Sequence, residues 1–323
     1  MTPFIVAEMS ANHLGDFGRA LAIVDAAADA GADAVKFQTW TPGSMCVSDY
    51  RLNHGPWSGR YLRELYAEAY TPWDWHEKLF ARARDRGLVP FSAAFDRDAV
   101  DFLERLGVDR HKVASFELTD LPLIRYMASK GKPMILSTGM ATVVEVDAAI
   151  EACHSSGSMI TLLKCTSAYP AEAGDANLAT MEWWRRYDAG LSDHTLGIGV
   201  AVAATALGAT MIEKHLTLSR ADGGLDAAFS MEPREFKQMV IECRRAAAAI
   251  GQVHYGCGPG ESTELRRSLW LKRDVGVGEV LRLHDNVCTA RPALGVPPST
   301  DLTGRRAARA LRAGEPLTMD CLL

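Results

Sequence analysis

The chain has 323 residues, of which 48% are hydrophobic and 23% are charged, with 27 Gly and 14 Pro. This is the composition of an ordinary globular protein with enough material for a large core and a second, smaller unit. The formal charge of -5 is spread along the chain without a basic block, which argues against nucleic acid or a membrane surface as a partner and leaves small polar or anionic ligands.

The first residues, Met1-Thr2-Pro3, run directly into an apolar segment that ends at Glu8. They contain no basic n-region, long h-region or cleavage site, so we do not expect secretion through such a signal. The cysteines are scattered and form no C-x-x-C pair; they are Cys46, Cys153, Cys165, Cys243, Cys257, Cys288 and Cys321. We therefore expect free thiols and a cytoplasmic protein.

Short apolar runs alternate with stretches of helical periodicity, which is typical of βα units around a parallel sheet. The runs are residues 4–7, 34–37, 88–91, 112–114, 133–136, 160–163, 189–191 and 210–212. Among the expected helices, residues 19–30 place apolar side chains on one face, and residues 72–86 follow the capping pattern Thr71-Pro72-Trp73-Asp74. Eight strands with eight helices predict an α/β fold, the TIM (β/α)8 barrel.

Polar side chains stand at nearly every predicted strand end, where active sites of this barrel are built. They are Glu8, Lys36, Gln38, Ser92, Lys112, Ser115, Ser137, Lys164, Ser167, Tyr169, Ser192, His194, Glu213 and His215. Any one of them is equally explained by the general polarity of strand ends, because the loops that follow strands lie in solvent. As a set, they predict convergence at one mouth of the barrel.

His194 and His215 end the last two predicted strands, so the fold brings two imidazoles side by side. Two histidines with open positions suit a divalent metal acting as a Lewis acid on a carbonyl oxygen. Hydrogen-bonded structural histidines are the alternative reading.

Lys36 and Lys112 are expected in the same mouth, and such a pair suits a ligand with a phosphate and a carboxylate group. The hydroxyl and amide groups that would complete the site belong to Gln38, Ser92, Ser115 and Ser137. A buried lysine that forms a Schiff base, as in covalent aldolases, is a second mechanism, and solvated lysines at the rim are a third possibility.

Glu8 stands before the polar turn Asn12-His13-Leu14-Gly15-Asp16 and is placed to bind sugar hydroxyls or to handle a proton. The turn itself is also explained by helix capping. Asp226 closes a glycine-rich acidic loop after the last strand and is a candidate contact to sugar or to metal-bound water.

The pattern changes after about residue 251 to a Gly/Pro-rich segment followed by short β-like runs. We expect a barrel over residues 1–252, a linker over 253–266 and a small β-rich domain over 267–323.

Several motifs, in this order, resemble the sialic acid synthase family. They are Ala7-Glu8 with Asn12-His13, Val35-Lys36-Phe37-Gln38, Lys112-Val113-Ala114-Ser115, Ser137-Thr138-Gly139-Met140, Ser192-Asp193-His194-Thr195 and Glu213-Lys214-His215. The resemblance spans essentially the whole chain, and the tail resembles that family's antifreeze-like (SAF) domain. The segments around Trp57, Tyr70 and Asp222 favour the pseudaminic acid branch of the family.

The resemblance implies condensation of phosphoenolpyruvate with an amino-sugar aldehyde, with the metal, Mn²⁺ in preference to Mg²⁺ or Co²⁺, on His194 and His215. It implies catalytic roles for Glu8, Lys36 and Lys112. It implies substrate contacts by Gln38, Ser115, Ser137, Ser167, Tyr169, Asp226 and Arg291, and the predicted strand ends add Ser92 and Ser192 as candidate substrate contacts. Arg291 would come from the partner subunit, so the resemblance also implies a domain-swapped homodimer.

Two departures from the family pattern stand out. Ala93-Ala94 replaces a hydroxyl residue and proline, so that a phosphate contact is absent or supplied by Ser92, and Ser167 replaces the asparagine of N-acetylneuraminate synthases. N-acetylneuraminate and legionaminate synthases, a Schiff-base aldolase, a non-catalytic sugar-binding module and a synthase of seven- or eight-carbon acids remain alternatives.

Overall fold

The computed structural model describes residues 2–154, 157–184 and 186–323. It divides into two compact units, Met1–Gly251 and Gln252–Leu323. Within the described residues, no helix is both long enough and apolar enough to cross a membrane.

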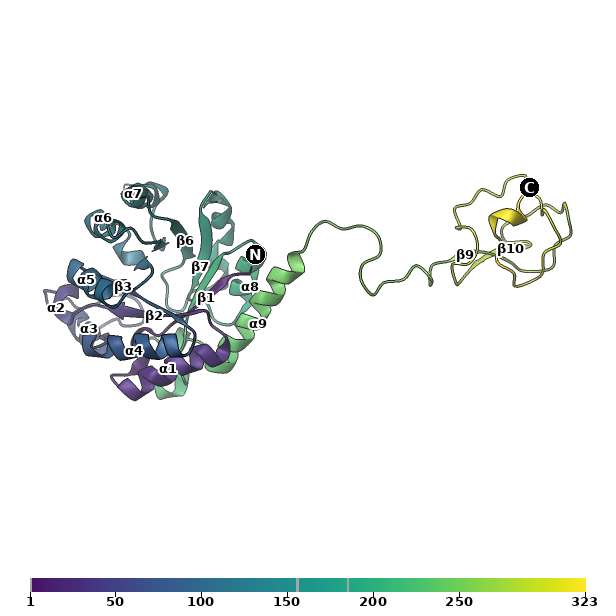
Figure 1. Cartoon of the computed structure of the whole chain (residues 1–323). Helices are drawn as coiled ribbons and strands as arrows, with labels where there is room; N and C mark the ends of the chain where they lie inside the picture. Colours follow the sequence, from purple (N-terminus) through teal and green to yellow (C-terminus); the bar gives the residue numbers. More distant parts are fainter. Residues whose placement is uncertain (1, 155–156, 185) are drawn as a thin grey trace. The chain divides into compact units, whose positions relative to one another are not determined.

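The first unit is a closed barrel of parallel strands in sequential order, with β8 paired to β1. Figure 1 shows this unit in the colours from purple to green. The predicted barrel is therefore confirmed, and each predicted run overlaps an observed strand, with bounds that differ by at most three residues. The strands are β1 (Phe4–Glu8), β2 (Ala34–Thr39), β3 (Val89–Ala94), β4 (His111–Val113), β5 (Met134–Ser137), β6 (Ile160–Cys165), β7 (Asp188–Asp193) and β8 (Met211–His215).

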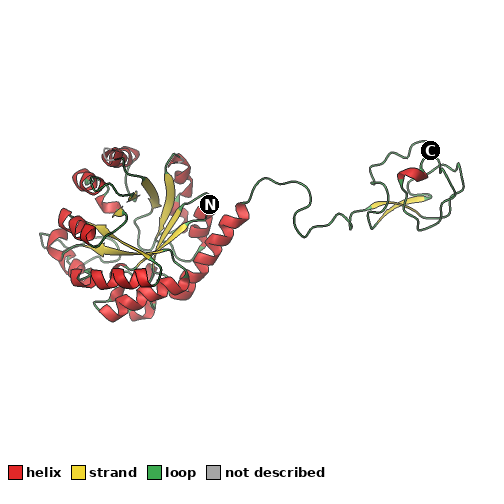
Figure 2. Ribbon diagram, viewed as in Figure 1, coloured by secondary structure: helices red, strands yellow, loops and turns green. Residues whose placement is uncertain are grey.

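Helices surround the strands of this unit, as Figure 2 shows in red around yellow. They are α1 (Phe17–Ala30), α2 (Pro42–Met45), α3 (Leu62–Ala69), α4 (Trp73–Asp85), α5 (Arg97–Arg105), α6 (Leu121–Ala128), α7 (Val143–His154), α8 (Gly199–Ala206) and α9 (Pro233–Ile250). α2 and α3 are additional to the one-helix-per-strand pattern and lie in a long connection between β2 and α4.

Side chains alternate between the inside and the outside of the barrel along each strand. The outer set, which includes Ile5, Phe37 and Ile212, belongs to the core shared with the helices. The inner set fills the barrel interior and contains Val6, Ala34, Phe91, Ile135, Leu163 and Met211. This alternation decides which strand-end residues reach the mouth.

Two local predictions were wrong. Thr71 does not cap α4, since the N-cap is Pro72 without a side-chain bond and the Thr71 hydroxyl contacts His13 Nε2 at 3.1 Å. The described residues of the β6–β7 connection form the 3₁₀ helices Ala173–Ala176 and Leu178–Trp184 where an α-helix was expected, with left-handed Asn177 between them. Asp16 does cap α1, accepting from the Arg19 amide at 2.7 Å.

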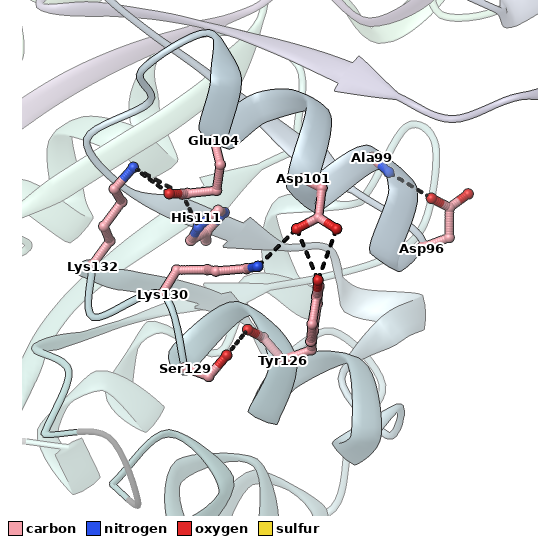
Figure 3. A network of polar contacts seen from close by, with 9 residues as sticks. All are labelled: Asp96, Ala99, Asp101, Glu104, His111, Tyr126, Ser129, Lys130 and Lys132. Carbon is pink, nitrogen blue, oxygen red and sulfur yellow. Dashed lines mark hydrogen bonds and ion pairs between the residues drawn. The ribbon is translucent and has the colours of Figure 1, made fainter.

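An ion-pair network ties α5 to the start of β4 and to the connection before β5 (Figure 3). Glu104 accepts from Lys132 Nζ at 2.8 and 2.9 Å and contacts His111 Nε2 at 2.9 Å. Asp101 accepts from Lys130 and Tyr126. Because His111 begins its strand, this network lies away from the carboxyl ends that form the mouth.

The second unit has its own small apolar core, which includes Leu269, Val287 and Leu317. Its regular elements are the antiparallel strands β9 (Ser268–Leu271) and β10 (Val287–Ala290), with a short 3₁₀ helix at Met319–Cys321. This agrees with the predicted β-rich C-terminal region.

Candidate active site

Buried charges of alternating sign form the floor of the barrel mouth. Lys36 Nζ lies 2.6 Å from Glu8 Oε2 and 3.5 Å from Glu213 Oε1, and these side chains are almost completely buried. Burial raises the pKa of Glu8 to about 7, against the lowering effect of Lys36. Burial also opposes the charge of Lys36, but the two carboxylates outweigh it and raise the pKa of this ammonium group.

Lys112 provides the second positive group of the floor. Its Nζ donates to Ser137 Oγ at 2.7 Å and to the Val113 carbonyl at 3.1 Å. Burial lowers its pKa, with Glu213 acting in the opposite direction. Lys36 and Lys112 thus enter the mouth from different strands, as predicted.

The turn at Gly139 brings two hydroxyl groups close to its backbone. A Cβ atom on Gly139 would lie 2.5 Å from Ser115 Cβ and 2.7 Å from Ser167 Oγ, and the residue has a φ of +34°. Only glycine permits this approach. The result is a cradle beside the Lys112–Ser137 contact, and its hydroxyl donors and ammonium group suit an anion.

His194 and His215 stand together as predicted, with ring centroids 5.3 Å apart. His194 Nδ1 donates to the Thr166 carbonyl at 3.0 Å, so the neutral form of this ring carries its lone pair on Nε2. His215 Nδ1 is buried, has no hydrogen-bond partner among the described residues and lies 4.0 Å from Asp226 Oδ2. Burial, with the positive charges nearby, lowers the pKa of His215 well below its usual value.

Asp226 is held at the mouth by the first βα loop. Ser10 Oγ donates to Asp226 Oδ2 at 2.5 Å, and the Ala11 amide donates to the same oxygen at 3.4 Å. Burial raises the pKa of Asp226, and the Ser10 bond opposes this shift. The predicted loop residue therefore does join the site.

An apolar lobe extends the mouth on the side of α2 and α3. The cavity, about 220 Å³, is lined by apolar and aromatic side chains next to Gln38, Ser115, Tyr169, His215 and Asp226. The lobe is formed by Trp40, Met45, Leu52, Trp57, Leu62, Leu65, Tyr66, Phe95 and Phe116. Trp57 closes it, since its Nε1 donates to the Leu225 carbonyl at 3.2 Å and its ring lies 5.7 Å from that of Tyr169.

Two of the strand-end residues point away from the mouth. Ser92 follows Phe91, which faces inward, so its hydroxyl lies on the outer side and contacts Thr39 Oγ1 at 2.7 Å. Ser92 therefore does not supply the contact that Ala93 lacks. Lys164 likewise follows inward-facing Leu163 and donates to the Cys165 carbonyl at 2.8 Å.

The remaining predicted residues divide between the two units. Ser192 reaches the floor and donates to Glu213 Oε1 at 3.2 Å. Arg291 is exposed on the second unit, directly after β10. That unit has a cavity of its own, lined by Arg282 and Asp301 among mostly apolar residues, which contains none of the candidate site residues.

Glu117 is a mouth residue that the sequence reasoning missed. It lines the cavity two residues after Ser115, its Oε2 is buried without a hydrogen-bond partner among the described residues, and burial raises its pKa to about 7. Glu213 was recognised at a strand end but not included among the site residues. The available signal was the run Lys112-Val113-Ala114-Ser115-Phe116-Glu117, which places a carboxylate one short turn beyond the strand.

The chain matches the model of the NeuB family over residues 23–255 and that of the SAF domain over residues 266–323. It is 40% identical to the pseudaminic acid synthase of Helicobacter pylori, covering 98% of this chain and 97% of that one. The chain belongs to the NeuB family.

Other NeuB-family proteins are similar over comparable lengths. The N,N'-diacetyllegionaminic acid synthase of Legionella pneumophila is 37% identical, covering 98% of this chain and 94% of that one. The crystal structure of an N-acetylneuraminic acid synthetase from Leptospira borgpetersenii superposes with a TM-score of 0.74 at 30% identity, covering 80% of this chain and 88% of that one. The chain is therefore a phosphoenolpyruvate-dependent nonulosonic acid synthase.

NeuB-family enzymes depend on a metal, and the two histidines fit one. His215 has a buried nitrogen with no partner among the described residues and a lowered pKa that favours its neutral form. His194 is oriented by a hydrogen bond through its Nδ1, as metal-binding histidines usually are. Among the described residues, no group of three or more His, Cys, Asp or Glu side chains is arranged to hold a metal. A metal on this pair would therefore complete its coordination with water or substrate.

Proposed function

We propose that this enzyme is a pseudaminic acid synthase. It joins phosphoenolpyruvate to 2,4-diacetamido-2,4,6-trideoxy-altrose and releases phosphate. The observation that carries the proposal is a mouth with a charged floor and an apolar lobe, in a chain 40% identical over nearly its whole length to a protein named pseudaminic acid synthase. The lobe suits a sugar that carries a methyl group and a second acetamido group in place of hydroxyls.

Phosphoenolpyruvate lies over Lys36, Lys112 and the Gly139 cradle in this proposal. The two ammonium groups balance phosphate and carboxylate, and Ser115 and Ser137 donate to the remaining oxygens. Gln38 and Ser192 complete this side. Held in this way, phosphoenolpyruvate meets the sugar in a fixed orientation. This orientation lowers the activation barrier by on the order of 7 kcal/mol.

The sugar aldehyde lies between the histidines and the apolar lobe. Glu8, Ser167, Tyr169 and Asp226 face its polar groups. A divalent metal held by His194 and His215, Mn²⁺ in preference to Mg²⁺ or Co²⁺, supplies Lewis-acid polarisation of the aldehyde oxygen when it is bound.

The reaction forms one carbon–carbon bond and cleaves one carbon–oxygen bond. The methylene carbon of phosphoenolpyruvate bonds to the aldehyde carbon, water adds to the oxygen-bearing carbon, and the bond from that carbon to the phosphate oxygen breaks. The product is a 2-keto acid that closes to a ring. Glu8, with a pKa of about 7, is poised to accept a proton from the attacking water and to pass it to the oxygen of the former aldehyde, which ends as a hydroxyl group.

We also propose that a partner subunit completes the mouth. Apolar side chains are exposed on the loops around it, with Phe116 63%, Met140 56% and Leu196 63% exposed in the single chain. Arg291 of the partner's C-terminal unit would reach the N-acyl group of the sugar. The enzyme is then a domain-swapped homodimer.

Phosphate release tests the proposed reaction. We would incubate the full-length chain with phosphoenolpyruvate, Mn²⁺ and the diacetamido-trideoxy-altrose, and compare N-acetylmannosamine and an EDTA-treated sample. We expect release with the first sugar that EDTA abolishes. Release with N-acetylmannosamine alone would move the enzyme to the neuraminate branch, and no release with either sugar would contradict the proposal.

The same samples, treated with borohydride, distinguish the metal-dependent synthase from a Schiff-base aldolase. Lys36 is ion-paired with Glu8, and Lys112 Nζ is hydrogen-bonded to Ser137 Oγ and the Val113 carbonyl, so both amino groups are engaged by other groups of the site. We expect borohydride to trap no lysine adduct. A trapped adduct with EDTA-resistant turnover would favour a covalent aldolase.

A further inference from the structure

Asp193 and Lys214 form a buried ion pair on the outer side of the barrel, directly behind the two histidines. They face each other on neighbouring strands β7 and β8, with Lys214 Nζ 2.5 Å from Asp193 Oδ2. Their side chains are 1% and 0% exposed. Since side chains alternate along a strand, His194 and His215 point into the mouth while the preceding residues point into the layer below α9, where Cys243 lies.

Thr195 closes this pair into a ring of hydrogen bonds. Asp193 Oδ1 accepts from the Thr195 amide at 2.9 Å and from Thr195 Oγ1 at 2.8 Å. Lys214 Nζ also donates to the Thr195 carbonyl at 2.6 Å. The residues on both sides of His194 are thereby tied to the residue that precedes His215. We refer to Asp193, Thr195 and Lys214 as the clasp.

Stability alone is a poor explanation for the clasp. Removing two charges from water is costly, and replacing a buried ion pair with apolar residues is often neutral or even stabilising. Apolar packing would not supply directed hydrogen bonds, and such bonds fix the end of β7 relative to the end of β8. Among the described residues, no hydrogen bond orients the His215 ring through Nδ1. The ring packs against that of Phe229, with centroids 4.9 Å apart, and its position along the strand depends on the backbone that the clasp holds.

We propose that the clasp is a positioning device that sets the spacing of His194 and His215 and thereby the affinity for the metal. The proposal rests on the proposed role of these histidines as metal ligands. Since the described residues offer two histidines and no larger ligand group, the affinity of the site depends on holding both imidazoles in place before the metal binds. Any reorganisation of the ligands on binding would weaken the affinity. Some groups orient the metal ligands without touching the metal. Mutating such a group typically lowers metal affinity about 10- to 100-fold.

The test measures Mn²⁺ affinity directly, by titrating metal-stripped full-length protein and following free Mn²⁺ by electron paramagnetic resonance. We expect Lys214→Met to raise the Kd for Mn²⁺ about tenfold or more. The KM for phosphoenolpyruvate at saturating Mn²⁺ should change by less than about twofold, since the floor and cradle are untouched. A merely destabilised variant would show no such separation.

The double variant Asp193→Leu/Lys214→Met guards against misfolding. It leaves no unpaired buried charge, so its melting temperature should be close to or above that of Lys214→Met. We expect its Mn²⁺ affinity to remain low despite the regained stability. The matched control is Lys132→Met, which breaks the Glu104 ion pair of Figure 3 and should leave the Kd for Mn²⁺ unchanged.

His194→Ala distinguishes the failure of this inference from that of the proposed function. If His194→Ala loses Mn²⁺ while both clasp variants fold and bind it within about twofold of the parent, the clasp is overturned and the metal site stands. If the parent binds no Mn²⁺, or His194→Ala binds it as the parent does, both proposals are overturned.

Discussion

Gly139 is a position where the absence of a methyl group shapes the site. A Cβ there would overlap Ser115 and Ser167, so the turn would have to move away from the cradle. We expect Gly139→Ala to reduce kcat/KM for phosphoenolpyruvate about 100-fold, because a displacement of this size misaligns the bound anion. Steady-state kinetics with varied phosphoenolpyruvate measure the loss.

Gly131→Ala is the matched control for this prediction. Gly131 also has a positive φ, +72°, but no atom of the described residues lies within 4 Å of a Cβ built there. It should cost about 1 kcal/mol of stability from backbone strain alone and leave the kinetics unchanged. Equal kinetic losses in both variants would show that strain, and not the cradle, is responsible.

His76 links residue chemistry to the pH dependence of stability. It lies buried behind the mouth, with Nδ1 donating to the Pro72 carbonyl at 3.1 Å and Nε2 contacting Thr39 Oγ1 at 2.9 Å. Burial lowers its pKa to about 4. Because the unfolded chain binds a proton near pH 6.5 and the folded chain does not, the stability that His76 contributes is present above pH 6.5 and is lost as the pH falls toward 4.

We therefore expect the stability difference between the parent and His76→Gln to shrink by about 1.4 kcal/mol per pH unit below 6.5. Urea unfolding of both proteins at pH 7, 6 and 5, followed by tryptophan fluorescence, measures it. The comparison must be between variants, because Glu117, whose pKa is raised to about 7, contributes with the opposite sign. A pH-independent difference would show that His76 titrates alike in both states.

The least predictable feature of the site was whether a given strand-end side chain points into the barrel mouth or to the outer side of the barrel. Residue types at strand ends identified most of the mouth, including Glu8, Lys36 and His215. Ser92 was misassigned because β3 extends to Ala94 and a shift of one residue along a strand exchanges its two faces. Glu117 was missed because it lies on a 3₁₀ turn beyond β4, where strand alternation no longer applies.

At the scale of elements, the connection that carries α2 and α3 distinguishes this barrel from a plain βα repeat. This connection supplies most of the apolar lobe. It is linked to the glycine-rich loop by the hydrogen bond from Trp57 Nε1 to the Leu225 carbonyl. Periodicity predicted the strands well, because buried parallel strands are short continuous apolar runs. It did not predict how this connection packs, since its contacts are made with loops distant in sequence.

Trp57→Phe tests the role of this connection. The variant keeps the ring but loses the donor to Leu225, so the loop that carries Asp226 is held less firmly. We expect the KM for the sugar to rise about fivefold, the equivalent of about 1 kcal/mol, with the KM for phosphoenolpyruvate unchanged. Trp183→Phe, at a site 77% exposed, is the control. A rise in both KM values would indicate general loosening of the mouth.

At the scale of the whole molecule, the proposed exchange of C-terminal units predicts complementation between two inactive variants. Arg291→Ala removes the proposed sugar contact of the C-terminal unit, and His215→Ala removes a proposed metal ligand of the barrel. If each site combines a barrel with the partner's Arg291, mixing and subunit exchange should restore activity in about a quarter of the sites. Size-exclusion chromatography establishes the dimer beforehand. Activity no higher than the sum of the separate variants would mean that Arg291 does not act across subunits.

The central claim is that this mouth selects the diacetamido-trideoxy sugar, and a competition assay tests it most directly. Limiting phosphoenolpyruvate would be offered with equal amounts of 2,4-diacetamido-2,4,6-trideoxy-altrose, its manno-configured isomer and N-acetylmannosamine. The nine-carbon acids, two of which are isomers of equal mass, would be separated by liquid chromatography against standards and quantified by mass spectrometry. The product ratio reports the ratio of kcat/KM values. We predict that pseudaminic acid dominates; an excess of legionaminic or N-acetylneuraminic acid would contradict the account.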